Sequence, residues 1–461
     1  MTNTSPSDAD DDRICVSCIG DDYLRDEVRA SGGVASCAVC GATASSWNVR
    51  QYAHRVFPIF ESRFNARAPE SFMGTSLISD GLTASEVIQS ITKCADDRAA
   101  DLILESLRDE WPWSPQNGDD DPLDDDLRFN LDNRATADSF LWNEIEEELK
   151  TRSRYFNPTI EARLQEMFSG VETLPDARQR SAVKVAGPGS DLTRIWRMRV
   201  TSALDDLNKI LTNPEREIGS PPPHAARSGR MNAAGISVFY GATELETCIG
   251  EVRAPVGARC VVAGFDIVRE LRLLDISVIT AAEAGDLSHF DPDYVHKRGR
   301  AVFLQHLSRA LQTPVLAGDE DAGYLPSQMV AEFLGSRRLP RFDGVVFPSI
   351  QSAGKGTNVV LFHHASVVQP SPTSRRLELH APDPEDDELV LIERAVPVAR
   401  PKYVGRGAPR VRVEDRISAL RLATETISIV DVKAVEYTFV RRGVGWIGQR
   451  EGRRRKAPRG K

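Results

Sequence analysis

The chain has 461 residues, of which 41% are hydrophobic and 27% are charged, and its formal net charge is −9. Such a composition is typical of a globular chain with two or three domains. The acidic balance argues against broad nucleic-acid binding, because phosphate contacts need a basic face. No apolar run reaches membrane-spanning length and the N-terminus is acidic, so we expect a cytoplasmic protein without membrane contact.

Four of the seven cysteines form the pattern C-x2-C-x18-C-x2-C, at Cys15, Cys18, Cys37 and Cys40. Each pair fits a tight turn that offers two thiolates to one tetrahedral ion, so we predict a structural zinc site in a zinc ribbon over residues 13–45. The other three cysteines lie in apolar surroundings and are interpreted as small buried hydrophobes: Cys94, Cys248 and Cys260.

The composition and the apolar periodicity of the remaining chain divide it into segments. Residues 1–12 are predicted to be a disordered acidic tail. Residues 46–170 show three- and four-residue apolar steps typical of helices, with a solvated acidic insertion, NGDDDPLDDDL. Residues 171–190 mix charge, Pro and Gly, as a linker does. Residues 369–461 form a C-terminal extension with one predicted strand, SIVDVKAVEYTFV, and a basic tail, for which disorder is favoured over nucleic-acid contact.

Residues 191–368 alternate irregularly between short β-branched runs and helical patterns, which favours an α+β fold over a doubly wound sheet. Within them, RSGRMNAAGISVFYGATELETCIGEVR (227–253) is predicted to form a turn, a strand over 236–240 and a helix from 245 to about 253. This segment places Arg230, Tyr240 and Glu251 within 27 residues of one another, on a turn, a strand and a helix. Arginine for phosphate, tyrosine for a ring and glutamate for a sugar or a developing cation suit a phosphorylated nucleoside.

A second stretch, FDGVVFPSIQSAGKGTNVVLF (342–362), has two apolar strands around a Ser- and Gly-rich loop, with Ser349 ending one strand and Asn358 starting the next. The loop lacks the G-x4-G-K-[ST] frame of a phosphate loop and precedes a strand, which excludes a nucleoside triphosphatase. Upstream, IWRMRV (195–200) is predicted to open the domain with Arg197 and Arg199. The segment YLPSQ adds Tyr324 and Gln328 at the start of a helix.

Together, the blocks GRMNxxGxxxFYGA…EVR, YLPSQ and DGVVFPS…GxNVVLF resemble the RES domain over roughly residues 190–365. This resemblance implies a fold akin to ADP-ribosyltransferases and a toxin of a toxin–antitoxin pair that degrades NAD⁺. It also implies an antitoxin, or another protein partner, that restrains the activity. The cysteine pairs and the helices after them resemble, more loosely, the HEPN/RES N-terminal region that precedes some RES domains.

Carried over residue by residue, the resemblance implies five site positions: Arg230, Tyr240, Glu251, Ser349 and Asn358. It also implies an arginine in the opening strand, which is Arg197 or, alternatively, Arg199. In this scheme Arg230 and Arg197 hold the pyrophosphate, and Tyr240 stacks on the nicotinamide ring or forms a hydrogen bond through its hydroxyl. Glu251 stabilises the oxocarbenium-like sugar or orients the nucleophile, and Ser349 and Asn358 hold ribose or phosphate.

For each of these residues, a structural role is the alternative to a role in the site. Arg230 and Glu251 could form a surface ion pair, and Tyr240 could belong to the core. Three histidines near the blocks are more simply exposed or structural: His224, His363 and His364. In the helical region, Arg50 and His54 have three residues between them, fewer than the R-x4–6-H pair of HEPN ribonucleases.

The favoured function is therefore an NAD⁺-degrading enzyme that cuts the nicotinamide–ribose bond with water or phosphate. The first alternative keeps the site and changes the acceptor, giving a mono-ADP-ribosyltransferase. The second alternative is a zinc-ribbon module that binds a partner and carries an inactive RES-like domain.

Overall fold

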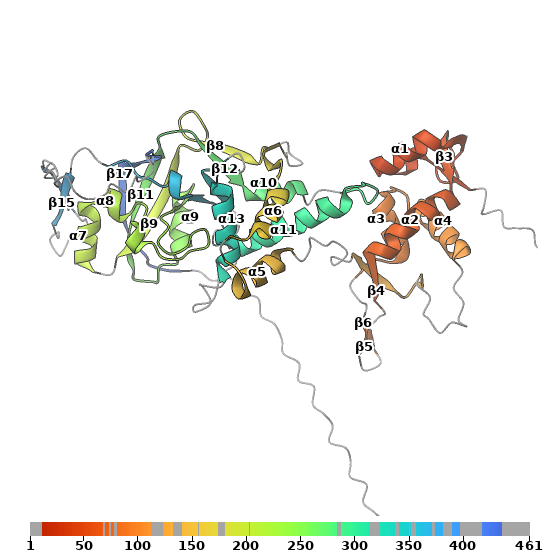
Figure 1. The fold of residues 1–461 in the computed structure, drawn as a ribbon, viewed down its shortest axis with the longest axis horizontal. Coiled ribbons are helices and arrows are strands. Elements are labelled where there is room, and N and C mark those ends of the chain that lie inside the picture. The colour runs from red at the N-terminus through yellow and green to blue at the C-terminus, as the bar shows by residue number, and fades with distance from the viewer. Residues whose placement is uncertain are drawn as a thin grey trace, which may run out of the picture.

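The fold is described from a computed structural model, which carries residues 12–67, 70–72, 75–77, 81–111, 123–131, 141–154, 156–173, 180–201, 203–283, 287–312, 323–336, 341–349, 351, 356–370, 374–380, 390–396 and 417–435. Two bodies are visible in Figure 1, joined by one long helix, α11 (Tyr294–Gln312). We call residues 12–131 the N-terminal body and residues 141–435 the sheet body. The predicted disorder of residues 1–11 and of the basic tail concerns residues outside this description.

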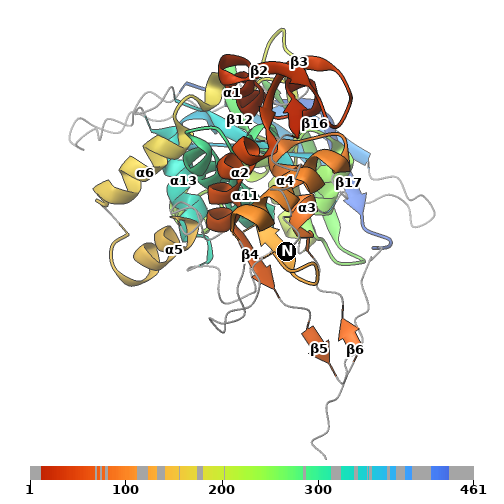
Figure 2. The same ribbon diagram turned by 90° about the vertical axis from the view of Figure 1, so that its right-hand side faces the viewer.

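The N-terminal body joins a three-stranded sheet to a helical cluster. Its elements are β1 (Arg13–Cys15), α1 (Asp22–Ser31), β2 (Gly33–Ser36), β3 (Thr43–Asn48), α2 (Val49–Arg63), β4 (Phe64–Arg67), β5 (Glu70–Phe72), β6 (Thr75–Leu77), α3 (Ala84–Thr92), α4 (Asp97–Glu110) and β7 (Arg128–Leu131). Asn48 and Thr83 begin α2 and α3 with capping boxes, in which the side chain and backbone of each cap exchange hydrogen bonds with the third helical residue. Figure 2 shows these helices in front of α11.

An eight-stranded sheet organises the second body, in the order β17-β11-β9-β10-β14-β13-β12-β8. Its elements are α5 (Leu141–Thr151), α6 (Pro158–Phe168), β8 (Val183–Ala186), β9 (Arg194–Thr201), α7 (Leu204–Thr212), α8 (Pro214–Glu217), β10 (Phe239–Ala242), α9 (Leu245–Val252), β11 (Arg259–Ile267), β12 (Leu271–Asp275), α10 (Ile276–Glu283), α11, α13 (Leu325–Gly335), β13 (Gly344–Pro348), β14 (Thr357–Leu361), β15 (Ser374–His380), β16 (Val390–Val396) and β17 (Leu420–Asp431). All neighbours pair antiparallel except β12 and β13, whose parallel pairing requires the crossover through α10, α11 and α13.

Both faces of this sheet are buried, and the two-residue strand period divides them. Val345 and Phe347 of β13 join a core with α5, α6, α10, α11 and α13, whereas Val346 joins a core with α7 on the opposite face. The predicted α+β class is confirmed: strands and helices are mixed without a regular βαβ repeat.

Several elements of the sheet body lie outside the predicted residues 191–368. Strand β8 falls within the predicted linker 171–190 and forms one edge of the sheet, beside β12. Helices α5 and α6 fall within the predicted helical region, yet Leu141, Ile145, Leu164 and Phe168 share a core with α11 and α13. At the other end, β17 of the C-terminal extension forms the edge of the sheet beside β11.

The position predicted for the C-terminal strand, 428–440, is wrong. Strand β17 spans Leu420–Asp431, residues 432–435 form no strand, and 436–440 lie outside the described residues. The strand is not apparent in the sequence because its polar stretch ATET (423–426) lies at a β-bulge opposite Val262 and Gly264. There Thr426 Oγ1 accepts a hydrogen bond from the Gly264 amide at 2.8 Å.

No helix in the described part of the chain is both long and apolar enough to cross a lipid bilayer.

Candidate functional site

The four N-terminal cysteines come together as one cluster, with their sulfur atoms all within 4.8 Å of one another. Cys15 Sγ lies 3.7 Å from Cys18 Sγ and 3.6 Å from Cys40 Sγ, and Cys18 Sγ lies 3.8 Å from Cys37 Sγ. Four sulfurs at about 2.3 Å from a tetrahedral zinc ion would be about 3.8 Å apart. The cluster therefore has the spacing that a structural zinc site requires.

The thiols of the cluster differ in pKa: burial and the neighbouring sulfurs raise the pKa of Cys15 and of Cys18, whereas the pKa of Cys37 is lowered. Burial disfavours ionisation of Cys37, yet backbone N–H groups of Cys40, Cys15 and Val39 point at its sulfur and lower its pKa to about 7. One of these bonds, from the Cys15 amide, measures 3.3 Å. These residues fit zinc, which would tie β1 to the loop between β2 and β3.

In the sheet body, the turn that carries Arg230 is held by its own neighbours. Asn232 Nδ2 donates to the carbonyls of Arg227, Ala233 and Ile236 at 2.9–3.0 Å. The Tyr240 hydroxyl donates to Asn232 Oδ1 and accepts from the Met231 amide, both at 2.9 Å. Because a phenol has a single proton, the hydroxyl of Tyr240 is committed to this turn and its ring is what the site can use.

The turn also explains two local features of the sequence. A Cβ atom at Gly229 would lie 2.8 Å from both Asn232 Oδ1 and the Tyr240 hydroxyl, so the turn requires glycine there. The strand predicted from Ile236 begins three residues later, at Phe239. The carbonyl of Ile236 is used by Asn232, and that of Ser237 accepts from Ser366 Oγ at 3.2 Å, so both are taken by side chains.

Helix α13 supports the same turn from the other side. Gln328 Nε2 donates to Ser228 Oγ and to the carbonyls of Gly229 and Asn232 at 2.8–3.0 Å. Ser327 Oγ donates to the Arg230 carbonyl at 2.5 Å. The YLPSQ segment therefore serves the backbone that presents Arg230. The motif blocks predict no role for Ser327. A hydroxyl in the first turn of an otherwise apolar helix is the sequence feature that points to such a polar contact.

The two sequence-distant blocks meet at Glu251, in the last turn of α9. Its Oε1 accepts hydrogen bonds from Ser349 Oγ at 2.5 Å and from Asn358 Nδ2 at 2.8 Å. Ser349 is fully buried and Asn358 is 8% exposed. A carboxylate near a helix C-terminus faces the negative end of the helix dipole, and these two donors offset that cost.

The position of Glu251 follows from helix geometry. It lies one turn after Thr247 and Cys248, which are the buried residues of α9, so it shares their face. Gly356 lets β14 approach this face, because a Cβ atom there would lie 1.7 Å from Thr247 Oγ1. Burial raises the pKa of the neighbouring Cys248 thiol to about 12, which keeps it a neutral hydrophobe, as the sequence predicts, and no nucleophile.

Three arginines and this one glutamate line a single cavity of about 390 Å³, a volume in the range of small-molecule sites. Its walls are Arg197, Met198, Gly229, Arg230, Met231, Tyr240, Gly241, Ala242, Cys248, Glu251, Val252, Arg253, Phe347, Asn358 and Val360. Ser349 does not line the cavity and supports it from behind, through its hydrogen bond to Glu251. The formal charge of the ionised lining is thus positive, which suits an anion with two phosphate groups.

Arg197, on β9, lines the cavity and is half-buried. Nη1 donates to the Tyr240 carbonyl at 2.6 Å, and the guanidinium lies 5.1 Å from the ring centroid of Phe239. Desolvation lowers its pKa to about 10, so it stays charged at neutral pH. Across the described chain, no carboxylate forms an ion pair with Arg197, and a partly desolvated cation without a counter-ion is costly unless an anion joins it.

The other two arginines are held from outside the cavity. Arg230 Nη1 donates to the carbonyl of Leu311, in the last turn of α11. Arg253 is exposed and follows α9 in the left-handed conformation, with φ 51° and ψ 40°. The side-chain oxygen of Gln351 accepts from Arg253 Nη2 at 2.6 Å and from Nε at 3.2 Å. Arg253 lines the cavity although the motif blocks assign it no role; its place two residues after Glu251 is the signal in the sequence.

Several competing candidates lie elsewhere. Arg199 donates to the carbonyl and carboxylate of Glu217, at 2.8 and 2.6 Å, and does not line the cavity. His224 is exposed, whereas the ring of His364 lies 3.2 Å from Asp343 Oδ1. The ring of His363 lies 3.0 Å from the Ser237 carbonyl. In the N-terminal body, Glu110 pairs with both Arg50 and His54.

Comparison with known proteins gives one match. Residues 174–381 match the family model of the RES domain. No curated protein and no solved structure matches the chain. The resemblance of the N-terminal region to the HEPN/RES region, and that of the fold to ADP-ribosyltransferases, stay predictions.

Proposed function

Residues 174–381 form a RES domain, and from this premise we propose that the chain degrades NAD⁺ by cleaving its nicotinamide–ribose bond. The family is associated with NAD-related toxin activity. One observation carries the proposal: the carboxylate of Glu251, fixed by Ser349 and Asn358, lies in the same cavity as Arg197 and Arg230.

Binding would use the cations and the aromatic ring. Arg197 is half-buried and has no ionic partner among the described residues, so a phosphate oxygen would neutralise its unpaired charge. Arg230 offers its remaining N–H groups to the second phosphate. Tyr240, whose hydroxyl is committed to the turn, presents its ring to the nicotinamide.

Bond cleavage then needs little acid catalysis. The bond between ribose C1′ and the nicotinamide nitrogen breaks, and its electron pair goes to the nitrogen, which already carries positive charge and leaves as neutral nicotinamide. The C1′ centre becomes oxocarbenium-like, and the fixed carboxylate of Glu251 stabilises it. An oxygen of water or phosphate bonds to C1′, and the proton released from water passes to Glu251 or to solvent. ADP-ribose or ADP-ribose 1″-phosphate is the second product.

The test is turnover of NAD⁺ by the purified chain, followed by chromatography of nicotinamide. Glu251→Gln should lower kcat by about 10²–10³-fold, which is typical of losing a fixed charge-stabilising group. Glu246→Gln, an exposed position on the same helix, is the matched control and should leave kcat unchanged. Full activity of folded Glu251→Gln would remove Glu251 from the mechanism.

Product analysis with and without phosphate distinguishes hydrolysis from phosphorolysis. Radiolabel from the ADP-ribosyl group that stays on protein or nucleic acid would instead establish an ADP-ribosyltransferase.

An enzyme that depletes NAD⁺ would harm its own cell, so we also propose a protein inhibitor that acts as an antitoxin does. Co-expression of adjacent genes, scored by growth and by cellular NAD⁺, tests it.

A further inference from the structure

The described residues 287–290, which precede α11, lie in the N-terminal body. Among them, Phe290 is 4% exposed and belongs to the hydrophobic core formed by residues 14–129. The guanidinium of Arg55, on α2, lies 5.0 Å from its ring centroid. Phe290 is therefore a core residue of one body supplied by the chain of the other.

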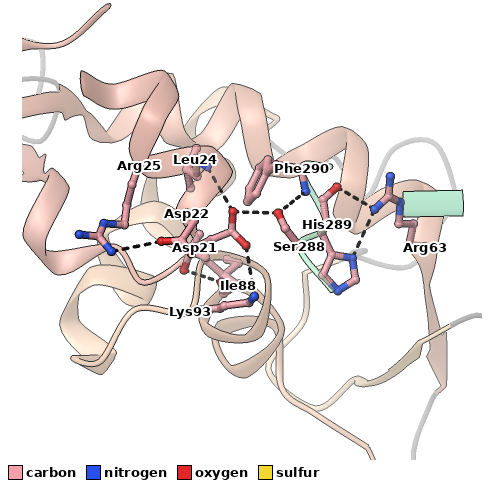
Figure 3. A network of polar contacts seen from close by, with 11 residues as sticks. Asp21, Asp22, Leu24, Arg25, Arg63, Ile88, Lys93, Ser288, His289 and Phe290 are labelled. Carbon is pink, nitrogen blue, oxygen red and sulfur yellow. Dashed lines mark hydrogen bonds and ion pairs between the residues drawn. The ribbon is translucent and has the colours of Figure 1, made fainter. Parts of the chain in front are cut away.

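Polar contacts surround Phe290, as Figure 3 shows. Asp21, fully buried at the start of α1, accepts from Ser288 Oγ at 2.8 Å and lies 3.4 Å from Lys93 Nζ. Arg63 Nη1, at the end of α2, donates to the His289 carbonyl at 2.8 Å. Residues at the start of α1 and on α2 thus contact three successive residues, Ser288 to Phe290.

The first turn of α11 is held by the same surface. The Tyr294 ring is 4% exposed, lies 3.9 Å from the guanidinium of Arg63 and stacks on the His289 ring at 4.6 Å. A helix of 19 residues spans about 28 Å, and α11 runs from here into the sheet body, where Phe303 and Leu307 are fully buried. Figure 1 shows α11 crossing between the two bodies.

At its other end, α11 meets the cavity. The carbonyl of Leu311 lies in the last turn, where helix carbonyls have no partner within the helix, and it accepts from Arg230 Nη1. The negative end of the helix dipole also favours a cation here. One helix therefore has its N-terminal end anchored in the N-terminal body and its C-terminal end bonded to a cavity arginine.

We propose that the N-terminal body positions Arg230 for the substrate through α11, with Phe290 as the anchoring residue. This inference rests on the proposed function, because it takes Arg230 to bind a phosphate of NAD⁺. Docking holds the helix at one axial position, and that position places the Leu311 carbonyl which orients the guanidinium. Sliding of a packed helix after release of its anchor is an ordinary shear motion, and it would move Arg230 away from the phosphate.

The test compares substrates with and without the pyrophosphate. Phe290→Ala should raise KM for NAD⁺ about tenfold and leave kcat within twofold, because a phosphate contact acts in both the ground and transition states. Turnover of nicotinamide riboside, which lacks phosphate, should stay unchanged, whereas general damage to the fold would lower both activities. Phe290→Leu should restore most of the affinity for NAD⁺, and Val295→Ala, an exposed neighbour on α11, is the matched control.

A double-mutant cycle decides whether the effect passes through Arg230. In the background of Arg230→Ala, Phe290→Ala should have no further effect on KM. Arg63→Ala, which loosens the contact without opening the core around Phe290, should repeat the KM effect if Phe290→Ala fails to fold. Hydrogen exchange of residues 288–296 reports undocking in each variant.

Undocked variants with the KM of the wild type, or effects that add fully in the cycle, would overturn this inference alone. A wild-type chain that neither consumes NAD⁺ nor binds ADP-ribose in calorimetry would overturn the proposed function and this inference with it.

Discussion

The cysteine cluster and the cavity assemble their functional groups in opposite ways. The cluster takes four side chains from a 26-residue span, and all four point at one centre. The cavity takes Arg197, Arg230, Glu251, Ser349 and Asn358 from distant strands, turns and a helix, and its members bond to one another and to backbone. The first arrangement would depend on one bound ion, whereas the second distributes its support over many contacts.

This contrast predicts that loss of zinc has the largest effect. Replacing Cys15 and Cys18 with serine should abolish metal binding, since two of four ligands are lost, and structural zinc contributes apparent free energies of about 10–16 kcal/mol in small domains. We expect loss of hydrogen-exchange protection throughout β1, β3 and α2, with protection of β13 and β14 retained. The measurements are elemental analysis and hydrogen exchange. Undiminished protection in the metal-free variant would remove the contrast.

The second prediction concerns the half-buried cation Arg197. Arg197→Met should weaken NAD⁺ binding about 10–100-fold, because a charge-assisted phosphate contact is lost. In the absence of ligand, the same change should raise the free energy of unfolding by about 1 kcal/mol, because a half-buried charge without a counter-ion is replaced by an apolar chain of similar length. Calorimetric titration and urea unfolding measure the two effects. A variant less stable than the wild type would show that Arg197 serves the fold.

The third prediction sharpens the idea of distributed support. Ser349→Ala removes one of two donors to Glu251 and leaves the other, from Asn358. We expect kcat to fall about tenfold, the equivalent of one hydrogen bond to a charged group, with little change in KM. Steady-state kinetics test it. A loss as large as that of Glu251→Gln would mean that support at this carboxylate is not shared.

The smallest effect is expected at the mouth of the cavity. Arg253 is exposed and its guanidinium is bonded to Gln351, so its charge acts on the ligand through solvent. Arg253→Ala should raise KM for NAD⁺ about threefold at low salt, and the difference should vanish at high salt as charges are screened. Arg259→Ala, another exposed arginine paired with Asp431, is the control for the change in net charge.

How far the sequence could predict the site depended on the range of each contact. The apolar runs within 342–362 and the helical pattern from residue 245 predicted β13, β14 and α9 closely, since periodicity reports which face is buried. Strand β17 was placed wrongly because a bulge interrupts its pattern. The assignment of α5 and α6 to the core beside α11 and α13 could not be predicted, because an amphipathic helix does not specify its partner.

The sequence by itself determined the chemistry: the residue types, the four-cysteine spacing, and the match of residues 174–381 to the RES domain family model. Tertiary structure decided which groups meet. It separated Arg197 from Arg199, committed the Tyr240 hydroxyl to a turn, and joined Glu251 to Ser349 across 98 residues of chain. Ligand spacing within a turn is fixed by local backbone geometry, whereas contacts between distant strands exist only once the sheet has set their register.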